Sequence, residues 1–264
     1  SAGYGNEKIY TEKKYDNLFA GRVSQVVPAG NIWSQKPVNI GYGTNIDNEV
    51  RKYTLTTTWV DGRTETAISG PVFYPANQLG KNTVTDPDGN TGTEFKNGKG
   101  ETILVRKNDG AQNVDTYYLH NEYGQLVYVI PPMAVTGTTP DQATLDKLCY
   151  QYRYDGQGRL VEKKVPGRGW DYMIYDAQDR PVATQDANLR EKGQWLYTKY
   201  DKFGRVTFTG INSGGGRSAE QIIATAYGSN NVSRTSSVFF NREGMDVYYD
   251  PNSTYPVAGW VKLL

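Results

Sequence analysis

The chain has 264 residues. It contains 29 Lys and Arg and 28 Asp and Glu, which gives a formal net charge of +1. This balance excludes the basic surface by which proteins bind nucleic acid or an anionic membrane. A single Cys excludes a disulfide framework and a cysteine-based zinc cluster, and a single His limits metal ligation and triad chemistry. No apolar run approaches the ~18 residues of a membrane-spanning helix. We therefore expect no membrane span, no cofactor and no metal site.

Tyrosine and glycine are the residue types in excess, with 21 Tyr and 29 Gly. Tyrosine favours strands, whereas glycine and the 12 prolines favour tight turns. Aromatic residues make up 12% of the chain, which is high for a disordered polypeptide. The composition therefore predicts an all-β protein.

Residues 1–82 form the first expected region, of irregular β structure that precedes the repeats. Within it, Thr54–Val60 and Arg63–Ile68 flank Asp61-Gly62. Asp-Gly between two strand-like segments is typical of a two-residue hairpin turn. We therefore predict a β-hairpin at this point.

Residues 83–264 form the second expected region, in which a short motif recurs. It consists of Tyr and Asp, two variable residues, Gly, Arg and an apolar residue, and its three clear copies have aspartates 21 and 25 residues apart. Weaker copies contain Asp86, Asn97 and His120-Asn121, and Tyr15-Asp16 with Gly21-Arg22 resembles the unit with two residues inserted. The residues that define the clear copies are Tyr154, Asp155, Gly158 and Arg159; Tyr175, Asp176 and Arg180; and Tyr200, Asp201, Gly204 and Arg205.

Each position of the motif has a physical reason. Tyr ends a strand, Asp starts a turn by accepting from backbone amides, and Gly adopts a positive φ as the chain reverses. In the second copy Asp179 stands at the Gly position, and Asp tolerates the left-handed conformation better than most residues. A period of 21 to 25 residues fits two strands and two turns. We therefore predict stacked antiparallel β-hairpins in a curved open sheet.

One or two short helices are expected beside the repeats. An insertion near residues 131–148 contains Thr139 as a candidate N-cap for a helix over Asp141–Leu148. Ser218 and Gln221 resemble a capping box for a second helix. The three glycines before it, 214–216, are expected to form a flexible turn, because no Gly-Lys-Ser/Thr follows to make a phosphate loop.

The Tyr-Asp-x-x-Gly-Arg-Leu unit resembles the YD repeat of the RHS/YD-repeat family of large bacterial secreted proteins, most specifically from Tyr150 through Gly210. The stretch from about Gly21 to Gly110 resembles the region before the repeats in some of these proteins. The resemblance implies a hairpin spiral that closes into a β-shell around a variable C-terminal toxin. In other members the repeats serve in adhesion on the cell surface. Asp86-Pro87 and Asp250-Pro251 do not complete the family's Asp-Pro-x-Gly-Leu self-cleavage motif, so we expect a fragment from the front of a longer protein.

The residues that could carry chemistry have structural interpretations. His120 occupies the Tyr position of a repeat, so we expect a ring packed beside a turn. Cys149 is expected to fill the core. The segment from Asp86 resembles a calcium loop, but Gly89 is fourth where that loop requires Gly at the sixth place. We expect no catalytic residue and no enzyme.

The aromatic residues leave two interpretations open. Trp170 and Trp195 each stand two residues before a Tyr on the same strand face, and they either pack between neighbouring hairpins or stack on a ligand. Tyr154, Tyr175 and Tyr200 occupy equivalent places, which predicts a ladder of tyrosine rings across adjacent hairpins.

The resemblance and the repeats together predict a structural scaffold that is secreted or lies on the bacterial cell surface. Its expected partners are the remainder of the same polypeptide, including an enclosed or displayed C-terminal toxin-like domain, and the secretion machinery. The alternative is a cell-surface adhesin or carbohydrate-binding module, whose partner would be cell-surface carbohydrate.

Overall fold

The computed structural model describes residues 7–17, 21–108, 110–256 and 260–263, the last group by backbone alone. The described chain forms two compact units. Unit 1 comprises residues 1–56 and 66–149, and unit 2 comprises residues 57–65 and 150–264. Both consist mainly of antiparallel strands with a few short helices, so the predicted all-β class is confirmed. The boundary between the units at 149/150 reflects the contacts between residues. The boundary expected at 82/83 marks the place where the repeat motif begins in the sequence.

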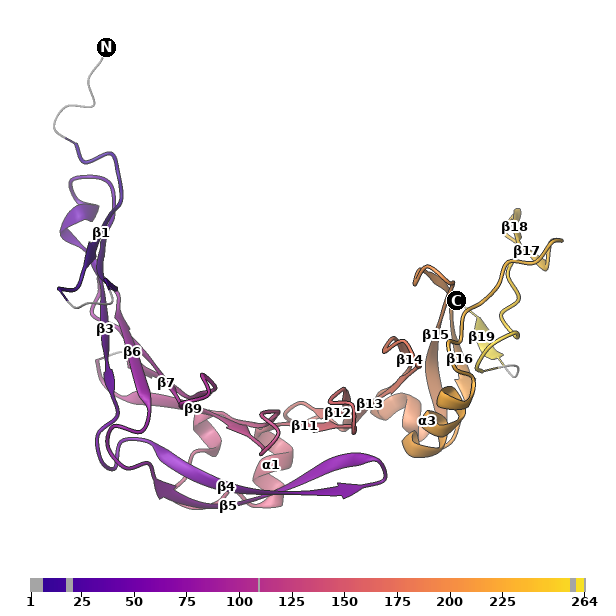
Figure 1. Ribbon diagram of the computed structural model, residues 1–264, viewed down its shortest axis with the longest axis horizontal. Coiled ribbons are helices and arrows are strands. Elements are labelled where there is room, and N and C mark those ends of the chain that lie inside the picture. The colour runs from indigo at the N-terminus through magenta and orange to yellow at the C-terminus, as the bar shows by residue number, and fades with distance from the viewer. Residues whose placement is uncertain (1–6, 18–20, 109, 257–259, 264) are drawn as a thin grey trace, which may run out of the picture. The chain divides into compact units, whose positions relative to one another are not determined.

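Eight strands of the described chain form the sheet of unit 1, and Figure 1 labels several of them. In sheet order they are β1 (Glu12–Tyr15), β2 (Val23–Val27), β3 (Val38–Thr44), β6 (Gly80–Thr85), β7 (Thr91–Lys96), β8 (Thr102–Asn108), β9 (Asn113–His120) and β10 (Leu126–Ile130). Short helices in this unit are η1 (Trp33–Gln35), η2 (Pro132–Ala134) and α1 (Gln142–Leu148). Phe95, Leu104 and Ile130 of this sheet are fully buried.

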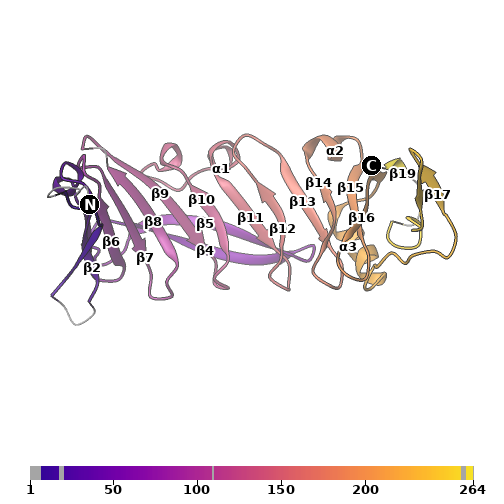
Figure 2. The ribbon, with the colours of Figure 1, turned by 90° about the horizontal axis from the view of Figure 1, so that it is seen from above.

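The sheet of unit 2 contains seven strands, and Figure 2 shows β11 to β16 side by side in chain order. The strands are β11 (Tyr150–Tyr154), β12 (Leu160–Lys164), β13 (Trp170–Tyr175), β14 (Pro181–Gln185), β15 (Gln194–Tyr200), β16 (Val206–Ser213) and β19 (Trp260–Leu263). A separate hairpin pairs β17 (Phe240–Arg242) with β18 (Met245–Val247). The helices are α2 (Ala187–Glu191) and α3 (Arg217–Ala226).

A long hairpin, β4 (Arg51–Val60) and β5 (Arg63–Phe73), has the predicted two-residue turn. Asp61 and Gly62 both have positive φ, 50° and 72°, as this turn requires. The tip of the hairpin, residues 57–65, belongs to unit 2.

The expected helix caps are wrong. In α1 the N-cap is Asp141, whose side chain accepts from the Thr144 amide at 2.8 Å, whereas Thr139 donates to the carbonyl of Gly70. In α3 the N-cap is Gly216, which has no side chain, and no capping box forms. Gln221 instead exchanges hydrogen bonds with the backbone of Tyr175, at 3.1 and 2.8 Å. Tertiary contacts with a strand thus outweigh the local capping pattern.

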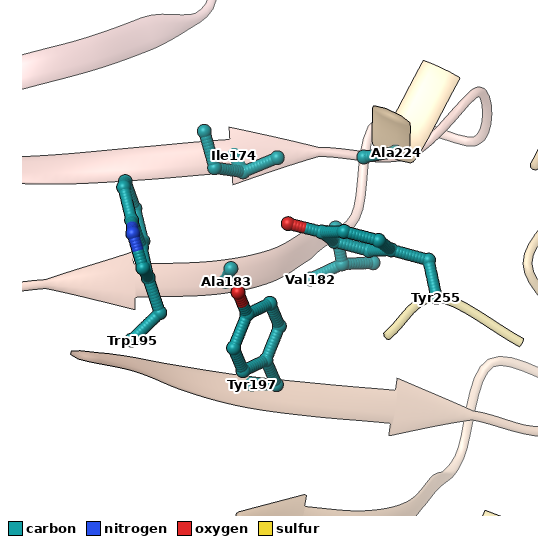
Figure 3. Packing of buried hydrophobic residues seen from close by; sticks show 7 residues of the cluster. All are labelled: Ile174, Val182, Ala183, Trp195, Tyr197, Ala224 and Tyr255. Carbon is teal, nitrogen blue, oxygen red and sulfur yellow. The ribbon is translucent and has the colours of Figure 1, made fainter. Parts of the chain in front are cut away.

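The core of unit 2 lies between β13–β15, α3 and the segment that contains Tyr255 (Figure 3). Trp195, Tyr197 and Tyr255 are almost fully buried. The rings of Tyr197 and Tyr255 pack edge to face, with their centres 5.4 Å apart. Both tyrosine hydroxyls donate to the buried carboxylate of Glu220, and the Trp195 indole donates to the carbonyl of Gly215 at 3.0 Å. Every one of these buried polar groups therefore has a partner.

Gly214 is fixed by this core, in contrast to the flexible turn expected from the sequence. A Cβ at Gly214 would lie 2.7 Å from both Trp195 Cδ1 and the Tyr197 hydroxyl, and 2.9 Å from Glu220. The chain passes this close because the residue has no side chain. At Gly216 a Cβ would meet nothing within 4 Å.

We predict that Gly214→Ala destabilises unit 2 by about 1 to 3 kcal/mol, since the added methyl group must displace packed rings. Chemical denaturation followed by tryptophan fluorescence measures this loss. Gly216→Ala is the matched control, with little expected change, and equal stability of the two variants would contradict the packing described for Gly214.

Candidate functional site

The three clear repeat turns share one hydrogen-bonded structure. In each, Oδ1 of the aspartate accepts the amide two residues later and the amide four residues later, at 2.9–3.0 Å. The other oxygen, Oδ2, accepts from Nε of the arginine at the fifth place, at 2.7–2.8 Å. The predicted role of Asp155, Asp176 and Asp201 in starting the turns is confirmed. Asp179 indeed adopts a positive φ of 59°, and Gly158 and Gly204 have φ of 79° and 77°.

The weaker copies have the same turn, with matched changes at its first and fifth places. Asp86 accepts from the Asn90 side chain at 2.9 Å. Where the first residue is asparagine, its side-chain amide donates instead, and the fifth residue is an acceptor: Glu101 for Asn97 and Gln125 for Asn121. An Asp at the first place is thus followed by a donor and an Asn by an acceptor.

A β-bulge accompanies the repeat turns. The register shifts by one residue immediately before the turn in six hairpins, those whose first strand ends at Tyr15, Lys96, His120, Tyr154, Tyr175 or Tyr200. The extra residue lies on the second strand of the hairpin. It is apolar and buried in four of the six hairpins: Ile103, Val127, Val161 and Val182. The weak copy at Asp86 lies at the other end of the strands and has no shift. The bulge therefore belongs to the repeat rather than to turns in general.

Adjacent repeats are joined by an arginine of one and the tyrosine of the next. The guanidinium of Arg159 lies 4.9 Å from the Tyr175 ring centre, and that of Arg180 lies 4.7 Å from the Tyr200 ring centre. The Tyr175 hydroxyl donates to the carbonyl of Leu160 at 2.8 Å, and that of Tyr200 does so to Pro181 at 2.9 Å. We call such an Arg–Tyr joint a rung.

Each rung also includes the backbone of the next turn. Nη1 of Arg159 donates to the carbonyl of Asp176 at 3.2 Å, and Nη1 of Arg180 donates to that of Asp201 at 3.3 Å. One arginine thus closes its own turn and holds the following one. The ring-over-ring tyrosine ladder predicted from the sequence is replaced at Tyr175 and Tyr200 by cation–π contacts with arginine.

Unit 1 contains one further rung and one pair of different residues at an equivalent place. In the first, Arg22 closes a turn with Asp16 at 3.3 Å and lies 4.3 Å from the Tyr42 ring, whose hydroxyl donates to Val23 at 3.1 Å. This bears out the copy with two inserted residues. In the second, continuing the register of β8 and β9 beyond the pair of Leu104 and Tyr117 sets Glu101 opposite His120, so a carboxylate and an imidazole take the places that Arg and Tyr have in a rung.

His120 has the packed position expected of it, at the tyrosine place of its repeat. Its Nδ1 atom is buried and has no hydrogen-bond partner among the described residues. Burial lowers the pKa of His120, and the nearby Glu101 carboxylate opposes this shift. The folded protein therefore favours the neutral imidazole.

The two tryptophans have different surroundings. Trp195 is fully buried, so it has no exposed face on which a ligand could stack. Trp170 is half-buried, and the Arg153 guanidinium lies 4.0 Å from its ring centre. Lys164 lies 5.9 Å from the same ring. Trp195 thus packs within unit 2, whereas the Trp170 ring contacts two cationic side chains.

A charged cluster fixes the hairpin tip within unit 2. The buried carboxylate of Glu162 accepts from Arg63 at 2.8 Å, Arg153 at 2.9 Å and Arg217 at 2.9 Å. Glu65 binds the first two of these arginines, each at 2.7 Å. Sequence reasoning missed this cluster, because its members lie far apart in the chain.

A buried lysine holds another non-repeat segment. Lys199 is fully buried and donates to the carbonyls of Pro251, Thr254 and Pro256, the last two at 2.6 and 2.7 Å. Burial lowers the pKa of Lys199 to about 7. The carbonyls supply the polar partners that the ammonium group loses on leaving water.

The single cysteine and the metal-ligating residue types have plain structural surroundings within the described ranges. Cys149 is buried, and burial raises the pKa of its thiol to about 11, which suppresses the reactive thiolate. Within the described ranges, no three His, Cys, Asp or Glu side chains are grouped to hold a metal ion. No described helix is both long enough and apolar enough to cross a membrane.

No family model matches the chain, and no curated protein matches it. The function must therefore be inferred from the repeats and their contacts.

We predict that Asn97→Asp destabilises unit 1 by about 1 kcal/mol or more, because it replaces a hydrogen bond to Glu101 by two opposed carboxylates. Adding Glu101→Arg should restore the stability, because it recreates the pairing of Asp155 with Arg159. Urea denaturation of both single variants and the double variant gives the coupling free energy. Additive effects of the two substitutions would contradict the matched turn.

We also predict that acid weakens unit 1 through His120, the only histidine in the chain. Because its folded pKa lies below the ordinary value of 6.5, the stability it contributes is complete above that value and falls as the pH drops through it. Melting temperatures between about pH 7.5 and 5.5 should fall more steeply in the native protein than in His120→Gln. Parallel profiles for the two proteins would exclude this role.

Proposed function

We propose that the chain is a scaffold segment of a secreted or cell-surface bacterial protein, in which stacked hairpins build part of a β-shell around another domain. The resemblance of its repeat to the RHS/YD-repeat family suggests this function. The observation that carries it is the rung, because one joint occurs three times with Arg and Tyr and so extends a sheet by identical steps.

The two faces of the unit 2 sheet differ, which supports a role as part of a shell. On one face the buried residues Glu162, Ile174 and Lys199 contact the hairpin tip, α3 and the segment 251–256, respectively. Strand alternation places Met173 and Leu196 on the opposite face, where both are partly exposed. They line a groove of about 310 Å³ with Lys163, Asp171, Thr184 and Leu189. One face is thus closed by the chain itself, and the other is available to an enclosed domain.

The test uses the complete polypeptide of the natural gene. We expect further Tyr-Asp repeats beyond this segment and an unrelated domain that resists protease inside the intact protein but is digested when expressed alone. A complete polypeptide without such a domain, or equal digestion in both contexts, would contradict the shell.

Carbohydrate binding is the second candidate, favoured by one exposed indole ring in each unit. Trp33 is 62% exposed and Trp59 is 49% exposed. A sugar that stacks on one of these rings should raise the melting temperature of the native protein, and the Ala variant of that tryptophan, Trp33→Ala or Trp59→Ala, should lose this rise. A glycan panel that leaves the native melting temperature unchanged would reject this candidate.

A further inference from the structure

A small polar groove of unit 1 is lined by the start of β4, the turn at Asn97 and the end of β9. Its volume is about 90 Å³. Three of its lining residues are Tyr53 of β4, Glu101 at the fifth place of the turn, and His120 of β9. A space of this size accommodates the end of a side chain or a few water molecules, but not a whole drug-sized ligand.

The Tyr53 hydroxyl is buried and has no hydrogen-bond partner among the described residues. The side chain is only 8% exposed, and its ring packs edge to face on Tyr117 with the ring centres 5.7 Å apart. Burial raises the pKa of Tyr53, and the nearby Arg51 guanidinium opposes this shift without reaching hydrogen-bond geometry. A buried hydroxyl without a partner lowers stability, which indicates a role other than packing.

His120 and Glu101 supply two acceptors to the same groove. The Nδ1 atom of His120 is also buried and unpartnered among the described residues, and it accepts when the neutral imidazole carries its proton on Nε2. Oε2 of Glu101 accepts from the Asn97 side chain at 2.6 Å, whereas no described residue donates to Oε1. The groove thus offers one free donor, the Tyr53 hydroxyl, and two free acceptors.

The charges of the groove favour a neutral ligand. Arg51 and Glu101 are the charged residues that line it, and burial keeps His120 neutral. The Arg51 guanidinium donates to the carbonyl of Thr136. A bound anion would face the Glu101 carboxylate and a bound cation would face the Arg51 guanidinium, and both arrangements are unfavourable.

We propose that this groove binds a primary carboxamide, the group at the end of an Asn or Gln side chain. A carboxamide has one carbonyl acceptor and two N–H donors, which complement one hydroxyl and two acceptors. Its carbonyl oxygen accepts from the Tyr53 hydroxyl, and its two N–H groups donate to Nδ1 of His120 and Oε1 of Glu101. A free amide or a polypeptide side chain supplies this group. The inference goes beyond the proposed function and does not rest on it.

The single histidine gives the full chain one imidazole signal for NMR. Titration with acetamide at about pH 7.5 should shift the His120 ring signals saturably, with a Kd of about 10 mM. Acetate has nearly the same shape but is charged and lacks N–H donors, so it should bind at least about tenfold more weakly. A groove that holds water alone would give no saturable shift, and this result or equal binding of acetate would overturn the proposal.

Tyr53→Phe separates binding from folding. Removal of the hydroxyl should raise the melting temperature by about 2 °C, because an unpaired buried group is lost. It should also weaken acetamide binding at least about tenfold. Tyr15→Phe, at a side chain 57% exposed elsewhere in unit 1, is the control and should change neither quantity. Undiminished binding by Tyr53→Phe is incompatible with the proposed site.

Glu101→Gln tests the acceptor without breaking the turn. A glutamine at this place should accept from Asn97 as Gln125 accepts from Asn121. Its own amide nitrogen then stands where Oε1 of Glu101 stood. This variant should bind acetate more tightly than acetamide, because a donor replaces an acceptor and the charge of Arg51 is no longer opposed. An unchanged preference for acetamide would overturn the proposal.

Two larger probes distinguish the sources of the carboxamide. Free L-glutamine and a capped tripeptide, Ala-Gln-Ala, present the same group on different molecules. Tighter binding of the tripeptide assigns the groove to a polypeptide partner, and tighter binding of glutamine assigns it to a free amide. If neither probe shifts the His120 signals, the carboxamide assignment is overturned. None of these outcomes bears on the shell, which is tested by protease protection.

Discussion

The hairpins of both units depend on one side-chain oxygen in each repeat turn. Oδ1 of the first residue accepts hydrogen bonds from two backbone amides. The other polar atom of that side chain, Oδ2 of Asp or Nδ2 of Asn, binds the side chain at the fifth place. This arrangement provides partners for amides that a reversing chain would otherwise leave unpaired. In the clear copies the fifth residue is an arginine that reaches the next turn, as Arg159 reaches Asp176. The bond that forms a hairpin therefore also sets the position of its neighbour.

The residue before the repeat tyrosine differs in every clear copy, whereas the Asp and Arg of the turn are constant. It is Arg153 in the first clear copy, Ile174 in the second and Lys199 in the third. Arg153 binds the carboxylates of the hairpin tip and β12, Ile174 packs with Ala224 of α3, and Lys199 binds carbonyls of the segment 251–256. Constant positions thus join repeats to one another, and this variable position selects the segment that covers each repeat.

The sequence was sufficient to predict the turns, because their bonds lie within five residues. It predicted the Asp61-Gly62 hairpin and the left-handed Asp179 for the same reason. It was insufficient where the partner comes from another strand. The Tyr175 ring meets Arg159 instead of another tyrosine because the bulge and register decide which side chains stand opposite. Trp195 is buried by α3 and Tyr255, whose approach no local pattern encodes. The matched pairs Asn97–Glu101 and Asn121–Gln125 could have been found by reading the first and fifth places together.

The matched first and fifth places also constrain how such a chain can change over generations. A substitution of Asp by Asn at a turn, or the reverse, sets donor against donor or acceptor against acceptor until a second substitution follows at the fifth place. Duplication or exchange of a whole hairpin carries both residues together and avoids that unfavourable intermediate. Arrays of this kind should therefore vary more readily in the number of their hairpins than in the chemistry of a single turn.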